Sequence, residues 1–264
     1  KYLKNKIKLL VRYLTNKMQK YRSDNVLEEI YDEEYFNDNI VDSLPMAKYM
    51  SPKIKEYLNL NSVFDIGCAT GHWLSCYQEL GCDIFGLEGT SNSFPYLMID
   101  KEKVDIHDLR KPYNKTKNVD LISCIEVAEH IEPKFADVLV DTITMHQAPH
   151  ILMTAAPPGQ GGHGHFNLKY KPYWIKKFKK RGYIVDEDFQ NKIINWSKEA
   201  RENFSPPSEF RLFDKEGTPI KGPNWESHDD AMKGDLTKLK SQIWENVWIP
   251  FWFPHNVITF KKMS

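Results

Sequence analysis

The feature that most constrains the fold is an alternation of apolar runs with helical stretches between about Met46 and Tyr183. The apolar runs, typical of buried strands, are SVFDIG, CDIFGLEG, VDLISCIE and HILMTAAP. The helical stretches are MAKYMSPKIKEYL, HWLSCYQEL, FADVLVDTITMHQ and KPYWIKKFKKRGY. This order predicts an α/β fold, with a mostly parallel sheet covered by helices on both faces. Such sheets bind ligands at the carboxyl ends of their strands, near the point where strand order reverses.

The residues before this region change sharply in charge. Residues 1–22 carry eight Lys/Arg and no acid, with apolar side chains at helical spacing. Such a helix either packs as a linker on its own domain or binds a membrane surface or an acidic partner. From Asp24 to Asp42 there are eight acids and no Lys/Arg, and the interleaved aromatics indicate a segment that folds against a site. We expect residues 1–44 to form a helical extension.

After Tyr183 the alternation weakens. Residues 195–247 mix polar helix-like pieces with turn signals such as SPPSE, KEGTPIKGPNW and KGD. This composition predicts an insertion or lid, followed by a closing strand in NVITFKK. We therefore expect a single α/β domain over residues 45–264.

Charge and cysteine content narrow the class of protein. The formal net charge of +0 gives no electrostatic reason to expect a nucleic-acid or membrane partner. No apolar run reaches the roughly 18 residues that a membrane span needs, and no signal-peptide core follows the first residue, a lysine. We expect a segment of a longer protein, or one trimmed of a tag. The four cysteines, Cys68, Cys76, Cys82 and Cys124, form no CxxC pair. We therefore expect them to be buried reduced thiols, which favours a cytoplasmic location.

A glycine-containing loop follows the first predicted strand. The run VFDIGCATG delivers Asp65 and then Gly67 and Gly71, which allow a tight turn and close approach of backbone N–H groups to a ligand. The second strand ends at Glu88, about 20 residues further on, where an acid can hydrogen-bond a ribose. The spacing differs from the G-x-G-x-x-G of dinucleotide folds, and the absence of G-K-[ST] disfavours a P-loop. The pattern predicts a nucleotide-type site.

A second candidate site is the run EVAEH, which follows the strand VDLISCIE. Glu126, Glu129 and His130 would lie on one face if a helix began there. Two carboxylates and an imidazole suit a divalent cation, and packing two anions together otherwise raises a pKa. A helix N-terminus also tolerates acids through its dipole. On physical grounds alone the metal site and the solvated helix end stay equally open.

These motifs carry a family resemblance. In order and spacing, VFDIGCATG…GLEG…HDLRKPY…VDLISCIEVAEHI resembles the class I S-adenosylmethionine-dependent methyltransferases over roughly residues 45–185. The resemblance implies a Rossmann-like, doubly wound sheet of seven strands and S-adenosylmethionine as cofactor. Asp108, together with the Leu109 backbone, would contact the adenine, and Asp105 would be the second candidate for this contact. The residues that the resemblance implies for the cofactor are Asp65, Gly67, Cys68, Ala69, Gly71, Glu88, Gly89, Asp108, Leu109 and Glu126.

The run EVAEH also resembles the metal motif of ubiquinone-pathway O-methyltransferases and of small-RNA 3′-terminal 2′-O-methyltransferases, in which a further histidine completes the site. The candidates here are His163 and His165, and PPGQGGHGHFN…YW…F…RGY resembles methyltransferases of sugar-modifying systems in bacteria and large algal DNA viruses (chlorovirus-like), which favours His165. His163, His72 and His107 are expected to be ordinary polar residues. The implied ligands of Mg²⁺ or Mn²⁺ are Glu126, Glu129, His130 and His165, and the implied catalytic residues are His165, His130 and Glu129.

The resulting hypothesis is methyl transfer from S-adenosylmethionine to a sugar hydroxyl of a glycan. His165 would be a metal ligand or, without metal, the base. The chain would suit a domain tethered to glycosyltransferases, in the host cytoplasm if the protein is viral. The alternatives are an RNA-terminal 2′-O-methyltransferase, a quinone-like small-molecule O-methyltransferase and a cofactor-binding module without turnover. A nucleic-acid partner is disfavoured because charge is balanced and no Arg/Lys-rich aromatic platform is evident.

Overall fold

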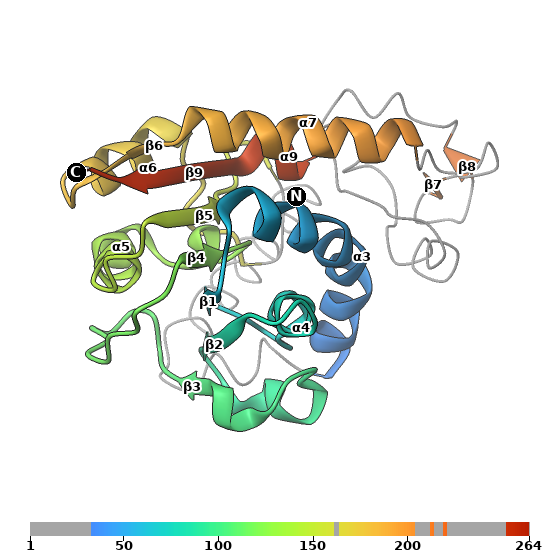
Figure 1. The fold of residues 1–264 in the computed structure, drawn as a ribbon, viewed down its shortest axis with the longest axis horizontal. Coiled ribbons are helices and arrows are strands. Elements are labelled where there is room, and N and C mark those ends of the chain that lie inside the picture. The colour runs from blue at the N-terminus through green and yellow to red at the C-terminus, as the bar shows by residue number, and fades with distance from the viewer. Residues whose placement is uncertain (1–32, 161–163, 204–211, 214–218, 221–251, 264) are drawn as a thin grey trace, which may run out of the picture.

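The computed structural model describes residues 33–160, 164–203, 212–213, 219–220 and 252–263 (Figure 1). The basic stretch 1–22, His163, Trp225 and most of residues 195–247 lie outside these ranges. Short 3-10 turns, η1 to η4, occupy Ser91–Tyr96, Lys101–Lys103, Ala128–His130 and Pro133–Phe135. The helices are α3 Glu33–Leu58, α4 His72–Glu79, α5 Ala136–Thr144, α6 Lys171–Lys179, α7 Glu187–Asn203 and α9 Trp252–Asn256.

The strands form one seven-stranded sheet of order β3-β2-β1-β4-β5-β9-β6, which confirms the predicted fold class. The first five strands in this order are parallel, and β9 runs antiparallel to both β5 and β6. A separate two-stranded pair joins β7 Leu212–Phe213 to β8 Pro219–Ile220. The strands of the large sheet are β1 Ser62–Ile66, β2 Asp83–Glu88, β3 Val104–Ile106, β4 Leu121–Cys124, β5 His150–Thr154, β6 Tyr183–Val185 and β9 Val257–Lys262.

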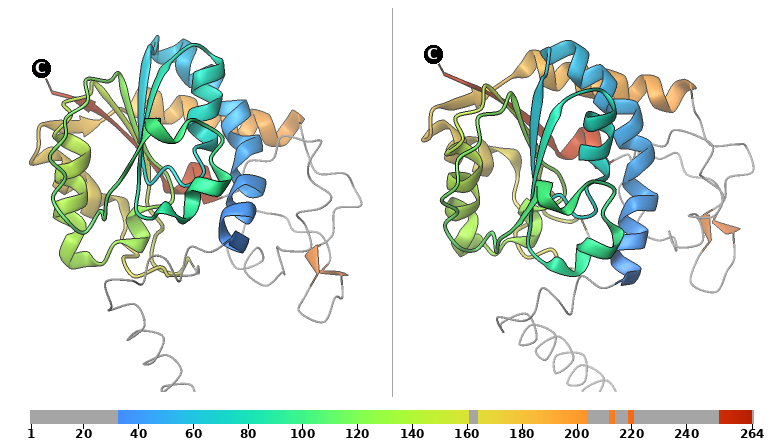
Figure 2. Two further views of the ribbon diagram at one scale, coloured as in Figure 1. Left: turned by 90° about the horizontal axis from the view of Figure 1, so that it is seen from below. Right: turned by 60° about the horizontal axis from the view of Figure 1, so that its bottom comes forward.

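Helices cover both faces of the sheet, with α5 on one side and α3 and α4 on the other (Figure 2). Successive residues of a strand place their side chains on opposite faces of the sheet. Val63 belongs to the core beneath α3 and α4, whereas Phe64 belongs to the core beneath α5 and α6. All four cysteines are buried free thiols, as predicted. Trp174 is buried in the core beneath α5 and α6, whereas Trp196 is partly buried against the core beneath α3 and α4.

Helix α3 is longer than the predicted MAKYMSPKIKEYL. It starts at Glu33 and continues through Pro45 and Pro52, so it runs across the expected boundary between residues 44 and 45. A proline inside a helix removes one hydrogen bond and strains the preceding turn. That cost is offset by apolar side chains that recur on one face and are fully or almost fully buried, at Met46, Met50 and Ile54. The domain boundary itself stays a prediction.

The strand order reverses between β1 and β4. From β1 the chain proceeds outward through β2 and β3, and then returns to place β4 on the other side of β1. Ligands of open α/β sheets bind beyond the carboxyl ends of the strands at such a reversal. The glycine loop follows β1 and the run EVAEH follows β4, so both sequence motifs lie at this point. In the part of the chain that the structure describes, no helix is both long and apolar enough to cross a bilayer.

Buried His146 makes stability depend on pH. Burial, and then the charge of Lys117, lower the pKa of His146 to about 4, whereas an unfolded histidine titrates near 6.5. Between these values the unfolded chain binds a proton that the folded protein does not, so stability falls as pH falls from about 6.5 to 4. After allowance for solvent screening, His146→Gln should remove about 1 to 2 kcal/mol of this pH dependence, measured by urea unfolding. A pH dependence of His146→Gln equal to that of the parent protein would contradict this assignment.

Candidate active site at the switch point of the sheet

The loop after β1 is a left-handed turn that is fastened to the end of β2. Gly67, Ala69 and Gly71 have φ values of 78°, 49° and 70°, a backbone region that favours glycine. The backbone N–H groups of Gly67 and Cys68 donate to the Leu87 carbonyl oxygen at 2.7 and 3.1 Å. These bonds hold the loop against the strand that carries Glu88.

Glu88 is buried at the end of β2, with both carboxylate oxygens engaged by backbone donors. Ala69 N–H donates to Oε2 at 2.8 Å, and Gly89 and Thr90 N–H donate to Oε1 at 2.8 and 3.3 Å. Burial raises the pKa of Glu88, although these three hydrogen bonds act in the opposite direction. The carboxylate therefore fixes the loop and the strand end in one geometry. Glu88 lies next to the glycine loop, and its contact with a ribose stays a prediction.

Asp65 joins β1 to its neighbour β4 through a side-chain hydrogen bond. The Ser123 hydroxyl donates to Asp65 Oδ1 at 2.6 Å, and both side chains are buried. Burial raises the pKa of Asp65 to about 7; the Ser123 bond lowers it and the charge of Glu88 raises it. The carboxyl ends of the two strands at the reversal are thus coupled by a polar contact in an apolar setting.

Gly67 also explains how the two motifs meet. A Cβ atom added to Gly67 would lie 2.3 Å from Val127 Cγ2, a separation that real atoms do not adopt. The Val127 side chain therefore packs directly on the glycine backbone, and Val127 is the second residue of EVAEH. This contact sets the glycine loop and the acidic turn against each other.

The residues expected near the adenine are engaged by neighbouring side chains. Asp108 forms a bidentate ion pair with Arg110, with two N–O distances of 2.9 Å, and Leu109 is buried. Asp105 accepts hydrogen bonds from Tyr113 at 2.7 Å and from Lys115 at 3.0 Å. His107 Nε2 lies 2.9 Å from a backbone carbonyl, and His72 is buried, so neither histidine is part of the acidic turn.

The run EVAEH does not begin an α-helix, which corrects the expected i, i+3, i+4 face. Glu126 has a left-handed φ of 57°, and only a single 3-10 turn, η3, follows over Ala128–His130. Thr154 at the end of β5 stabilises this unusual backbone. Its Oγ1 accepts from Glu126 N–H and donates to Glu126 Oε1, both at 2.7 Å. The Glu126 side chain is therefore held toward β5.

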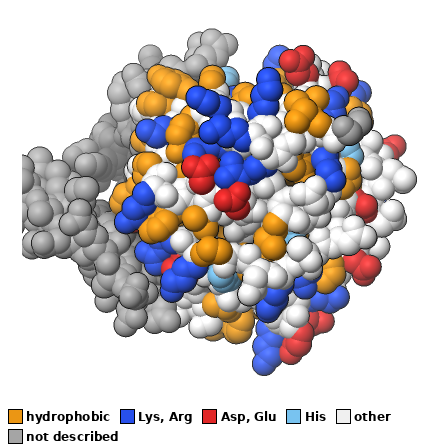
Figure 3. All heavy atoms as spheres, turned by 90° about the vertical axis from the view of Figure 1, so that its left-hand side faces the viewer, with side chains coloured by type: hydrophobic (Ala, Val, Ile, Leu, Met, Phe, Trp, Pro, Cys, Tyr) orange, Lys and Arg blue, Asp and Glu red, His pale blue; other side chains and the backbone are white. Residues whose placement is uncertain are grey.

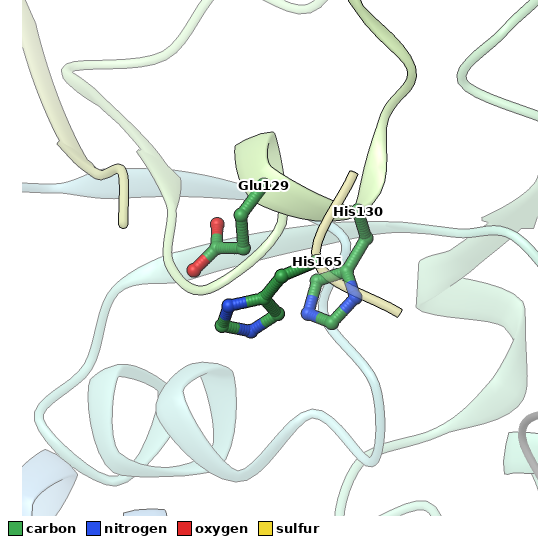
Figure 4. Close-up of side chains that lie close together, drawn as sticks. All are labelled: Glu129, His130 and His165. Carbon is green, nitrogen blue, oxygen red and sulfur yellow. The ribbon is translucent and has the colours of Figure 1, made fainter. Parts of the chain in front are cut away.

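A loop after β5 brings His165 to the same place. The backbone N–H groups of Phe166 and Asn167 both donate to the Glu129 carbonyl oxygen, at 2.8 and 3.0 Å. The rings of His130 and His165 meet edge to face with centroids 4.9 Å apart. One ligand atom from each of Glu129, His130 and His165 lies within 4.8 Å of the others (Figure 4). Glu126 lies outside this set, although it was predicted as a ligand.

The chemistry of this cluster fits a divalent cation. Glu129 is fully buried, and no hydroxyl or cationic donor among the described residues reaches its carboxylate oxygens, whose neighbour is the Glu126 carboxyl. Burial, and then the charge of Glu126, raise the pKa of Glu129 well above its usual range. A buried carboxyl without donors is costly unless a proton or a cation accompanies it. The two imidazoles beside it favour a cation such as Mn²⁺ over Mg²⁺, which prefers oxygen ligands alone.

Sequence reasoning missed several polar residues around this cluster. Ser123 and Thr154 read as ordinary strand residues, and Asn256 belongs to a segment far away in the sequence. Asn167 is 1% exposed, and its amide has no hydrogen-bond partner among the described residues. The signal that could have found Ser123 and Thr154 is their position: each is a polar residue at the carboxyl end of an otherwise apolar strand.

The comparisons with known proteins agree with this geometry. A family model described as a methyltransferase domain matches residues 32–155, which include the glycine loop, Glu88 and EVAEH. A search of curated protein sequences found no match. Residues 32–155, slightly less than half of the chain, are thus similar to a methyltransferase domain.

Solved methyltransferase structures resemble about half of the chain. The methyltransferase domain of bacterial CtHen1 is 16% identical, covers 54% of this chain and 88% of its own, and has a TM-score of 0.43. An O-methyltransferase family protein from Burkholderia thailandensis is 14% identical over 58% and 54% of the two chains, with a TM-score of 0.46. The amino pentose methyltransferase CalS10 from Micromonospora echinaspora is 12% identical over 53% and 83%, with a TM-score of 0.44. Similarity at this level carries no information on the substrate.

Gly67→Ala should weaken cofactor binding more than its effect on stability would explain. The new methyl group meets Val127 and adopts a left-handed φ, so the loop must move away from the acidic turn. We expect at least a tenfold rise in the dissociation constant for S-adenosylmethionine, measured by calorimetry.

Gly81→Ala is the matched control, because Gly81 has a φ of 83° with no atom within 4 Å of an added Cβ. It should lower stability by roughly 1 kcal/mol and leave cofactor affinity unchanged. Adding Val127→Ala to Gly67→Ala should recover part of the affinity. Equal affinities for Gly67→Ala and the parent protein would contradict the contact.

Proposed function

We propose that this domain transfers a methyl group from S-adenosylmethionine to a hydroxyl oxygen of a glycan sugar, with a divalent cation held by Glu129, His130 and His165. The observation that supports it most strongly is the carboxylate and two imidazoles within 4.8 Å of one another. They lie beside the glycine loop because Val127, packed on Gly67, is two residues before Glu129. Donor and acceptor would therefore meet at the switch point.

The chain's own residues would act mainly by alignment. Holding a sulfonium donor and a hydroxyl in line removes much of the entropic barrier to transfer. Glu88 and the 67–71 loop would position the donor, and the Asn167 amide, which lacks a partner among the described residues, offers a donor and an acceptor to a substrate hydroxyl. A bound cation would lower the pKa of a coordinated hydroxyl. His165 would accept the proton if turnover needs no metal.

Surface charge favours a neutral acceptor over RNA. Two basic residues, one in α6 and one just after it, lie beside acids of α5: Lys177 pairs with Asp137 at 2.6 Å, and Arg181 pairs with Asp141 at 2.6 Å. On the face drawn in Figure 3, basic and acidic side chains are interspersed. Phosphate recognition needs unpaired cations along a groove, so the pairing of Lys177 and Arg181 disfavours an RNA platform in the run KYKPYWIKKFKKR. The choice of a sugar rests on the resemblance of the histidine loop.

The test is a methyl-transfer assay with purified protein and radiolabelled S-adenosylmethionine. Acceptors would be deoxyhexose-containing oligosaccharides, short RNAs with free 3′ ends and catechol-like small molecules, each with Mn²⁺, with Mg²⁺ and with chelator. We expect transfer to the oligosaccharides, stimulated more by Mn²⁺ than by Mg²⁺. Transfer to RNA 3′ ends alone would overturn the sugar assignment. Tight cofactor binding without any turnover would indicate a binding module.

Substitutions in the cluster should separate chemistry from cofactor binding. Glu129→Gln, His130→Asn and His165→Asn should each lower turnover by about 100-fold or more and leave affinity for S-adenosylmethionine within about threefold. Glu132→Gln, a change in the same turn but outside the cluster, is the control and should keep full activity. Chelator-resistant transfer that His165→Asn still abolishes would remove the metal and leave His165 as the base.

A further inference from the structure

Asn256 is a buried amide that reaches the site from a segment distant in the sequence. It is the last residue of α9, immediately before β9, and is 1% exposed. In the antiparallel pairing of β5 with β9, Val257 lies opposite Thr154, and Ala155 N–H donates to the Asn256 carbonyl oxygen at 3.3 Å. Asn256 is thus placed beside Thr154, the residue that holds Glu126.

The Asn256 side chain ties together two elements that belong to different parts of the site. Its Nδ2 donates to Gln160 Oε1 at 2.9 Å, inside the protein, across 96 residues of sequence. The amide also lies next to the residue that holds Glu126, because Val257, its neighbour in the chain, is paired with Thr154. A carbonyl oxygen needs a donor, so the amide turns its NH₂ group toward Gln160.

Gln160 lies between the end of β5 and His165 in the sequence. On the other side of His165, the N–H groups of Phe166 and Asn167 are held by the Glu129 carbonyl oxygen. The described parts of this loop are therefore anchored at two points, by Asn256 before His165 and by Glu129 after it. The first anchor, Asn256, is the last residue of α9. The second, Glu129, belongs to the turn that supplies two members of the cluster.

We propose that Asn256 is a positioning residue for the cation cluster: it holds Gln160 and the end of β5 at Thr154 and Ala155 in place, so that His165 and Glu129 keep their separation. This inference rests on the proposed function, because it assigns to Asn256 the support of the same cluster. It places an outer contact of the site at the end of α9, immediately before the strand that lies between β5 and β6. Outer-shell partners of metal ligands commonly change metal affinity 10- to 100-fold when removed.

The test compares Asn256→Leu, which keeps the size and removes the donor, with Asn256→Asp, which also introduces a further carboxyl. Mn²⁺ affinity would be measured by electron paramagnetic resonance of the free ion, S-adenosylmethionine affinity by calorimetry, and unfolding by circular dichroism. We expect the dissociation constant for Mn²⁺ to rise about 10- to 100-fold in both variants. Affinity for S-adenosylmethionine should change less than about threefold.

Thr259→Val is the matched control. Thr259 lies three residues further along, on β9, and is fully buried, but its hydroxyl donates to the Asp186 carbonyl oxygen at 2.7 Å, not to the site. It should lose stability as an Asn256 variant does and keep the parent affinity for Mn²⁺. A folded Asn256→Leu with parental Mn²⁺ affinity would overturn the proposal. If Asn256→Leu does not fold, the same result for Asn256→Asp would overturn it.

Failure of the proposed function looks different. In that case the parent protein itself binds no Mn²⁺ and transfers no methyl group, before any substitution is made, and the positioning role falls with it. A parent that binds Mn²⁺ and is active, combined with Asn256 variants that also bind normally, removes only the role of Asn256. Equal losses of Mn²⁺ and S-adenosylmethionine affinity in the variants would likewise overturn it, because they would indicate a general structural defect.

Discussion

The packing of the Val127 side chain on the backbone of Gly67 is the contact on which the site depends. The loop after β1 and the turn after β4 leave adjacent strands, and each must turn sharply at the same edge of the sheet. With any side chain at position 67 they could not approach this closely. The hydrogen bond from Ser123 to Asp65 ties the same two strands just before they end. Cofactor loop and acidic turn are thus a single packed unit.

Around this unit the protein buries several carboxyls at one edge, and the way in which each is satisfied distinguishes its role. Glu88 is surrounded by backbone donors, Asp65 has a hydroxyl, and Glu126 has Thr154. Glu129 has no donor among the described residues and instead faces two imidazoles. Because a buried acid without a partner is unstable as an anion, the asymmetry itself indicates where a cation would bind.

Much of this arrangement was readable from local patterns, and the rest was not. Apolar runs with polar ends predicted the sheet, the glycine loop and Glu88, whereas the meeting of His165 with Glu129 and His130 was predicted from the family resemblance. The three-residue strand β3 escaped notice because it is too short to show alternation. The turn at Glu126 was misread as helical, since no local signal announces a left-handed glutamate that Thr154 stabilises across a strand pair. Asn256 depends on a pairing that links distant segments.

The position of β9 has a consequence for how such a protein can change over time. Both α7 and α9 are anchored to the core, so the chain between them begins and ends at fixed points. A change in chain length between Asn203 and Trp252 that keeps both ends in place would therefore leave Asn256 in register with β5.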